Sequence, residues 1–204
     1  MRDRSTRREW IGRTLLTAAG ATVGTGAGFA ATSGPALAAT PVPTDSETLA
    51  RVLEVERLMV LGYRRVLASG TLGPDDDAAL EPFLAQELEH ISTLAAHLEA
   101  LGAPADTAPL DVKTGDALLG KYHVPGSVTD VQTRKDSFRL LVNLESVAEG
   151  AYFTALKTLG TAELVRMSAQ AMACEAQHWT VLSGLRNPGI YVKSVPWPFV
   201  TGSS

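Results

Sequence analysis

Hydrophobic residues recur every three or four positions along most of this chain, which is the spacing of a helix face packed against a core. Four such stripes cover residues 45–70, 74–102, 138–160 and 161–186. The first stripe shows the pattern well, with Leu49, Val52, Met59 and Val66 on one face. No segment alternates hydrophobic and polar residues convincingly over the length of a strand. The pattern therefore predicts an all-α protein built on four long helices.

Residues at the stripe ends indicate where these helices begin and end. Asp45 and Ser46 are suited to cap the first helix, and Thr161 is suited to cap the fourth. Three aspartates at positions 75–77 favour a helix start after Gly73. Pro82 lies inside the second stripe, so the regular helix either begins there or is kinked there.

The lengths of the connections predict the topology. Only a few residues join the first stripe to the second and the third to the fourth, so each pair forms an antiparallel hairpin. Residues 103–128 are interrupted by prolines and glycines, and they predict a long crossover with at most a short turn at 117–119. Residues 40–186 therefore predict a four-helix bundle. Residues 187–204 predict an extended tail that lies over the bundle through Tyr191, Trp197 and Phe199.

Each stripe carries one glutamate in the middle of its hydrophobic face. The four are Glu56, Glu87, Glu145 and Glu175. A buried, unpaired carboxylate is so unfavourable that it is either protonated or paired with a cation. The stripes place no Lys or Arg close to these four residues. Two divalent metal ions would balance the four negative charges, so the pattern predicts a dinuclear metal site.

Two histidines strengthen this prediction. His90 follows Glu87, and His178 follows Glu175, in each case by three positions. Residues three apart share a helix face, so carboxylate and imidazole can reach one metal ion. Chance would give roughly 0.3 Glu-x-x-His pairs in this chain, against the two that occur on core stripes. The predicted ligands are Glu56, Glu87, His90, Glu145, Glu175 and His178.

The two halves of the chain also match each other. Tyr63 follows Glu56 by seven positions, and Tyr152 follows Glu145 by seven. Because helical side chains lean toward the N-terminus, each tyrosine is expected to lean back toward the glutamate of its own helix. There a phenol can hydrogen-bond a ligand or pass an electron, which makes Tyr63 and Tyr152 candidate catalytic residues. Core aromatic residues with a satisfied hydroxyl are the equally weighted alternative.

In order along the chain, Glu-x6-Tyr, Glu-x2-His, Glu-x6-Tyr and Glu-x2-His resemble the ferritin-like superfamily over residues 45–186. The chain is similar to exported bacterial ferritin-like proteins related to desiccation-associated proteins. The resemblance implies two Fe or two Mn ions per chain. It implies that Glu87 and Glu175 bridge them, that Glu56 and Glu145 are terminal or bridging ligands, and that His90 and His178 each cap one metal.

Four other residues are weaker candidates for a role at this site. His97 and Glu149 share stripes with the predicted ligands, and we expect them to lie outside the ligand set. Cys174 is expected to point away from the face of Glu175 and to be a small buried hydrophobe. His123 falls in the crossover, where nothing indicates a site.

Residues 1–39 read as an export signal. Arg7 and Arg8 precede an apolar run rich in Ala and Gly, which ends at a small-residue cleavage site near Ala38. The segment resembles a twin-arginine signal, which implies the twin-arginine export machinery as a partner. The expected location is extracellular, or in the cell envelope or periplasm. A disordered basic tail is the alternative interpretation.

Composition and charge reduce the range of possible functions. The chain has 204 residues, 45% of them hydrophobic and 20% charged, with a net charge of −4. No basic surface for nucleic acid is indicated, and one cysteine cannot form an intramolecular disulfide. We expect a dinuclear Fe or Mn protein that reacts with dioxygen or hydrogen peroxide. A non-catalytic metal-binding or envelope stress protein is the alternative, and a homo-oligomer is compatible with either.

Overall fold

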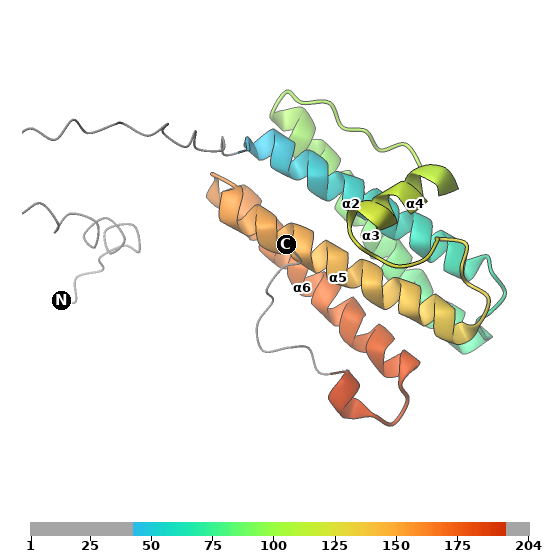
Figure 1. Cartoon of the computed structure of the whole chain (residues 1–204). Coiled ribbons are helices and arrows are strands. Elements are labelled where there is room, and N and C mark those ends of the chain that lie inside the picture. The colour runs from blue at the N-terminus through green and yellow to red at the C-terminus, as the bar shows by residue number, and fades with distance from the viewer. Residues whose placement is uncertain (1–42, 195–204) are drawn as a thin grey trace, which may run out of the picture. The chain divides into compact units, whose positions relative to one another are not determined.

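The structure, a computed structural model, describes residues 43–194, and all regular elements in that range are helices joined by loops (Figure 1). Four long helices form the bundle: α2 (Asp45–Leu67), α3 (Pro74–Ala100), α5 (Arg134–Thr158) and α6 (Ala162–Arg186). A short helix, α4 (Val112–Lys121), and one 3-10 turn, η1 (Tyr191–Lys193), complete the described chain. The expected all-α fold with a long crossover between two hairpins is confirmed. None of the helices in this range is long and apolar enough to cross a membrane.

The helix starts follow local capping rules. Thr44, rather than Asp45 or Ser46, caps α2, because its side chain accepts from the Glu47 amide while Glu47 accepts from the Thr44 amide. Thr161 caps α6 as expected. Helix α3 begins at Pro74 and continues through Pro82, so the regular helix does not wait for the second proline.

The crossover contains a helix that the sequence pattern did not predict. We expected at most a turn at 117–119, but α4 spans ten residues, and Asp111 caps it through the Thr114 amide. Gly115, which suggested a break, instead lies within α4 where this helix faces α2. A Cβ atom at this position would overlap with Leu61 Cδ2, so the Leu61 side chain would have to move to admit it.

The core is divided into two apolar clusters by a layer of buried carboxylates. One cluster contains Leu80 of α3 and Leu182 of α6, and the other contains Leu94 and Leu98 of α3 with Leu164 of α6. Glu87 and Glu175 lie between these levels on their helices. The bundle thus encloses a polar layer with hydrophobic packing above and below it.

Helices α2 and α5 form the packed centre of the bundle, and each also packs against its own hairpin neighbour. The backbones of α3 and α6 approach one another at few positions, so these two helices meet mainly through their side chains. Beyond α6 the chain forms η1, where the expected extended tail contains a helical turn. Tyr191 is 82% exposed, so it does not pack over the bundle as expected. Trp197 and Phe199 lie outside the described residues.

Candidate metal centre

The structure brings all six predicted ligand residues together at the middle of the bundle. Each of the four long helices supplies one glutamate, and all four glutamates are 0% exposed. Their ligand atoms form two groups, and within each group the atoms lie within 4.8 Å of one another. One group is Glu56, Glu87, His90 and Glu175, and the other is Glu87, Glu145, Glu175 and His178. Glu87 and Glu175 belong to both groups, which is the arrangement of two adjacent sites with shared ligands.

The two imidazoles point at these groups through the same ring nitrogen. His90 Nδ1 lies 2.9 Å from Glu175 Oε1, 3.5 Å from Glu87 Oε2 and 3.6 Å from Glu56 Oε1. His178 Nδ1 lies 3.0 Å from Glu87 Oε1, 3.6 Å from Glu145 Oε1 and 3.7 Å from Glu175 Oε2. Each histidine therefore faces three carboxylates, two of which are the shared ones.

Many atoms of the cluster converge without forming hydrogen bonds. Within the described residues, each of the six side chains has at least one buried nitrogen or oxygen atom that lacks a hydrogen-bond partner. The atoms are Glu56 Oε2, both carboxylate oxygens of Glu87 and of Glu175, Glu145 Oε2, His90 Nδ1 and His178 Nδ1. Buried polar atoms are normally satisfied, so these orphaned atoms fit a cation that they would coordinate.

Two residues that were not expected at the site lie against His178. Gln86 Oε1 lies 2.6 Å from His178 Nε2, the ring nitrogen that points away from the carboxylates. Hydrogen bonds of this kind fix the orientation of ligating histidines. Cys174 was expected to point away from the site, but its Sγ lies 3.5 Å from His178 Nε2 and 3.6 Å from Gln86 Oε1. The signal was available in the sequence, because Gln86 and Cys174 each precede the glutamate of a Glu-x-x-His pair.

The tyrosines bind carboxylates of the opposite hairpin. Tyr63 on α2 donates to Glu145 Oε1 on α5, and Tyr152 on α5 donates to Glu56 Oε1 on α2. The expectation that each tyrosine leans toward the glutamate of its own helix was therefore wrong. Because α2 and α5 pack side by side, each phenol reaches the glutamate of the neighbouring helix and not the glutamate of its own helix. Two hydrogen bonds thus cross between the halves of the molecule.

Burial and mutual repulsion set the protonation of the cluster. Burial raises the pKa values of Glu56 and Glu145 well above their ordinary range, and the neighbouring carboxylates raise them further. Burial would lower the pKa of each histidine, but the Cys174 thiol and the facing carboxylates raise both values instead. Burial and the adjacent carboxylates also raise the pKa values of Tyr63 and Tyr152, so both phenols stay protonated and act as donors.

The remaining candidates lie outside the ligand groups. His97 is half-buried and is absent from both groups among the described residues. His123 is exposed in the crossover and has a positive φ of 57°. Glu149 is half-buried, and burial together with the nearby charge of Glu175 raises its pKa to about 7. It is therefore an outer carboxylate of the cluster.

Removing either crossing phenol should destabilise the protein. In Tyr152→Phe, Glu56 Oε1 loses its buried donor, so we expect the free energy of unfolding to fall by about 1–3 kcal/mol. Tyr122→Phe is the matched control, because its hydroxyl donates over 3.3 Å to the partly exposed Glu54. The free energy of unfolding of the control should change by about 1 kcal/mol or less. Denaturant unfolding measures both variants. Equal losses would show that the buried Tyr152–Glu56 hydrogen bond stabilises the protein no more than the Tyr122–Glu54 hydrogen bond does.

Comparisons with known proteins identify the fold and the family. The family model described as "Ferritin-like domain" matches residues 44–188. A crystal structure of a conserved hypothetical protein from Mycobacterium tuberculosis is similar, with a TM-score of 0.57 and 21% sequence identity. The match covers 69% of this chain and 96% of that one. No curated protein sequence matches the chain. The likeness to the solved structure shows the shared fold alone, whereas the family model spans more than half of this chain. The chain therefore belongs to the ferritin-like domain family.

Proposed function

We propose that this protein binds two Fe or two Mn ions and reacts with dioxygen or hydrogen peroxide, as a ferroxidase-like or peroxide-detoxifying protein. One observation carries the proposal: two ligand groups share Glu87 and Glu175 and are buried in the middle of a helical bundle. A site for one ion would need only one of the two histidines and one of the two unshared glutamates, Glu56 and Glu145.

Charge supports two ions rather than one. Four ionised carboxylates carry four negative charges, and two divalent ions balance them. With a single divalent ion, two negative charges would remain, and only protons held on the histidines or the glutamates could balance them. The alternative is that the cluster keeps protons on Glu56 and Glu145, because burial and the neighbouring carboxylates raise both pKa values.

The residues of the chain would divide the work of such a site. Bound Fe or Mn would supply the redox chemistry toward dioxygen or peroxide. Glu87 and Glu175 would contribute ligands to both ions, and Gln86 orients His178. Tyr63 and Tyr152 hold Glu145 and Glu56 by hydrogen bonds from protonated phenols. The apolar clusters on both sides exclude water from the carboxylates.

We further propose that the protein is exported by the twin-arginine machinery to the envelope, the periplasm or the medium. This proposal rests on the sequence of residues 1–39, which lie outside the described residues. Export in the folded state would let the metal be loaded where the cell controls its supply. Fractionation of cells that express the full chain tests it, and retention with the cytoplasmic markers would refute it.

The test of function is metal content followed by oxidation. Protein loaded without oxygen should hold about two Fe(II) or Mn(II) ions per chain, one for each ligand group. Adding dioxygen or hydrogen peroxide should then change the absorption spectrum or release gas. Two bound ions without any reaction would instead support the non-catalytic metal-binding alternative. Binding of no ion would refute the proposal.

A further inference from the structure

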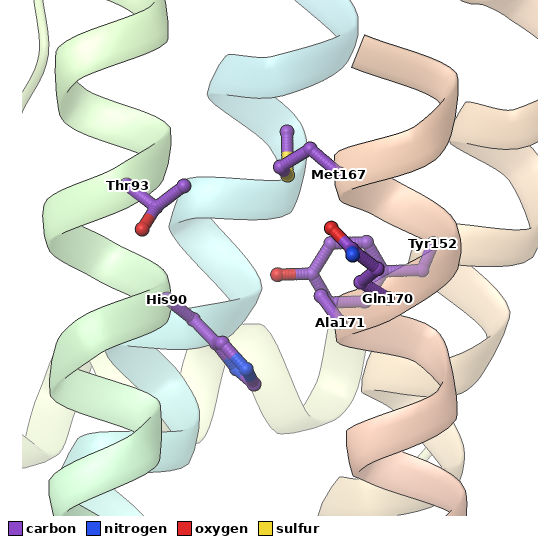
Figure 2. Close-up of a pocket in the computed structure, with 6 residues that line it drawn as sticks. All are labelled: His90, Thr93, Tyr152, Met167, Gln170 and Ala171. Atoms are coloured by element: carbon purple, nitrogen blue, oxygen red, sulfur yellow. The ribbon is translucent and has the colours of Figure 1, made fainter. Parts of the chain in front are cut away.

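A pocket of about 220 Å³ lies beside one half of the candidate metal centre (Figure 2). It is lined by His90, Thr93, Tyr152, Met167, Gln170 and Ala171. Figure 2 shows it between α3, which carries His90 and Thr93, and α6, which carries Met167, Gln170 and Ala171. This is the side of the bundle at which the backbones of α3 and α6 approach one another at few positions. The pocket therefore links the surface of the bundle to the His90 half of the cluster.

The internal repeat explains why the His90 half is more open than the His178 half. Glu175 and His178 follow Glu87 and His90 by 88 positions, so residues of α3 and α6 can be compared in pairs. Four positions before each of these glutamates stand Phe83 on α3 and Ala171 on α6. The Phe83 ring stacks on His178 with a centroid distance of 4.2 Å and an interplanar angle of 23°. Ala171 has no ring to place beside His90, and the pocket occupies that position instead.

Solvent exposure of the two histidines agrees with this difference. The His90 side chain is 14% exposed, whereas the His178 side chain is 2% exposed. Both histidines face the same number of carboxylates at similar distances, so the ligands themselves are arranged almost symmetrically. The asymmetry lies outside the ligands, in one alanine where the repeat has a phenylalanine.

The dimensions and lining of the pocket define what it can hold. Its volume exceeds the roughly 150 Å³ of an apolar cavity that accepts benzene, and it is several times the roughly 30 Å³ that a water molecule occupies. It is therefore larger than dioxygen or peroxide alone would need. Of the six lining residues only His90 readily carries a charge, and its Nδ1 already faces three carboxylates. Met167, Ala171 and the Tyr152 ring offer apolar contact, and Thr93 and Gln170 offer hydrogen bonds.

We propose that this pocket binds a small, uncharged organic molecule with an apolar body and delivers it to the His90 half of the cluster alone. The proposal deepens the proposed function, on which its chemical purpose rests. It makes the two halves of the site unequal: the His90 half meets the organic molecule, and the His178 half is closed by Phe83.

Methionine NMR on the full chain tests the binding. Phenol is the probe, because it is uncharged, fits the volume and carries one hydroxyl. With ¹³C-methyl methionine, the Met167 signal, assigned with Met167→Leu, should shift and saturate as phenol is added. The Met59 signal should not move, because Met59 is buried in the apolar cluster of Leu80 and Leu182, whereas Met167 packs against the other cluster. No saturable shift of Met167 would overturn the proposal.

Filling the pocket supplies the decisive variant. Ala171→Phe gives α6 the residue that α3 already has, and we expect it to weaken phenol binding by about tenfold or more, since a filled space cannot admit the ring. Ala173→Phe adds the same bulk on the exposed side of α6 and should bind phenol normally. If Ala171→Phe does not fold, Ala171→Leu fills less and serves the same comparison. Unchanged phenol binding in the folded filled variant would overturn the proposal.

A second measurement asks whether the pocket serves the cluster. In protein loaded with Mn(II), which is paramagnetic, the phenol protons should relax faster than in the Zn(II)-loaded protein. Ala171→Phe should abolish the difference. Phenol that shifts Met167 without this enhancement would overturn delivery to the cluster. The Met167 titration without metal is independent of the ions, so it distinguishes failure of the pocket from failure of the metal site.

Discussion

Glu87→Gln combined with Glu175→Gln should reduce bound metal from about two ions per chain to nearly none. Both carboxylates belong to both ligand groups, so their loss leaves each group with one glutamate and one histidine. Two ligands hold a divalent ion far more weakly than four, because each lost charged ligand also removes balancing charge. Glutamine keeps the size of the side chain, so the fold has no steric reason to fail. Elemental analysis after gel filtration gives the ratio directly.

Two single variants make this result specific. Glu56→Gln removes a ligand from one group only, and we expect about one of the two ions to be lost. Glu149→Gln changes a nearby carboxylate that belongs to neither group, and metal content should not change. Full metal content in the double variant, or equal losses in Glu56→Gln and Glu149→Gln, would refute the ligand assignment.

Removal of the metal should cause the second large effect, a fall in the melting temperature of about 15 °C or more. Each ion present at a thousand times its dissociation constant stabilises the folded chain by about 4 kcal/mol. For a chain of this size, 1 kcal/mol corresponds to about 2–4 °C. Without ions, the four carboxylates lie against one another in the dry interior. Calorimetry before and after chelation measures the change, and the Glu87→Gln, Glu175→Gln variant should show none.

The fall in melting temperature on removal of the metal should be larger at higher pH. In the metal-free protein the pKa values of Glu56, Glu145, His90 and His178 all lie above their ordinary values, so the folded chain holds more protons than the unfolded chain. Stability from such groups is complete at low pH and is lost as pH rises. Between about pH 5 and about pH 8 the metal-free protein should become less stable, and the loaded protein should not. A metal-free protein whose stability rises over this interval would contradict the raised values.

The long helices and the ligand residues could be predicted because each depends on a local pattern. Glu56, Glu87, Glu145 and Glu175 occupy hydrophobic stripes, and a stripe assigns a face without any knowledge of the neighbouring helix. The expected caps at Asp45 and Ser46 differ from Thr44 by one or two positions, which is the usual uncertainty of a helix end.

Features that depend on contacts between helices could not be predicted in this way. The glycine at 115 indicated a break, but it lies within α4 where this helix faces α2, which only the packed structure shows. The side-chain direction within one helix placed Tyr63 near Glu56, whereas packing of α2 against α5 places it on Glu145. Cys174 directly precedes Glu175, so it was expected to point away from the face of that residue. It lies instead against His178, one turn further along the same helix.

The sharing of ligands between hairpins has a consequence for how the protein matures. The group around His90 takes three residues from α2 and α3 and only Glu175 from α6, and the group around His178 mirrors it. Neither hairpin alone contains a complete group. The crossing phenols join positions 82 and 96 residues apart, so they form only after the hairpins dock. Metal uptake would therefore act as a checkpoint: a chain with one misplaced hairpin stays empty, and a loaded chain has already finished folding.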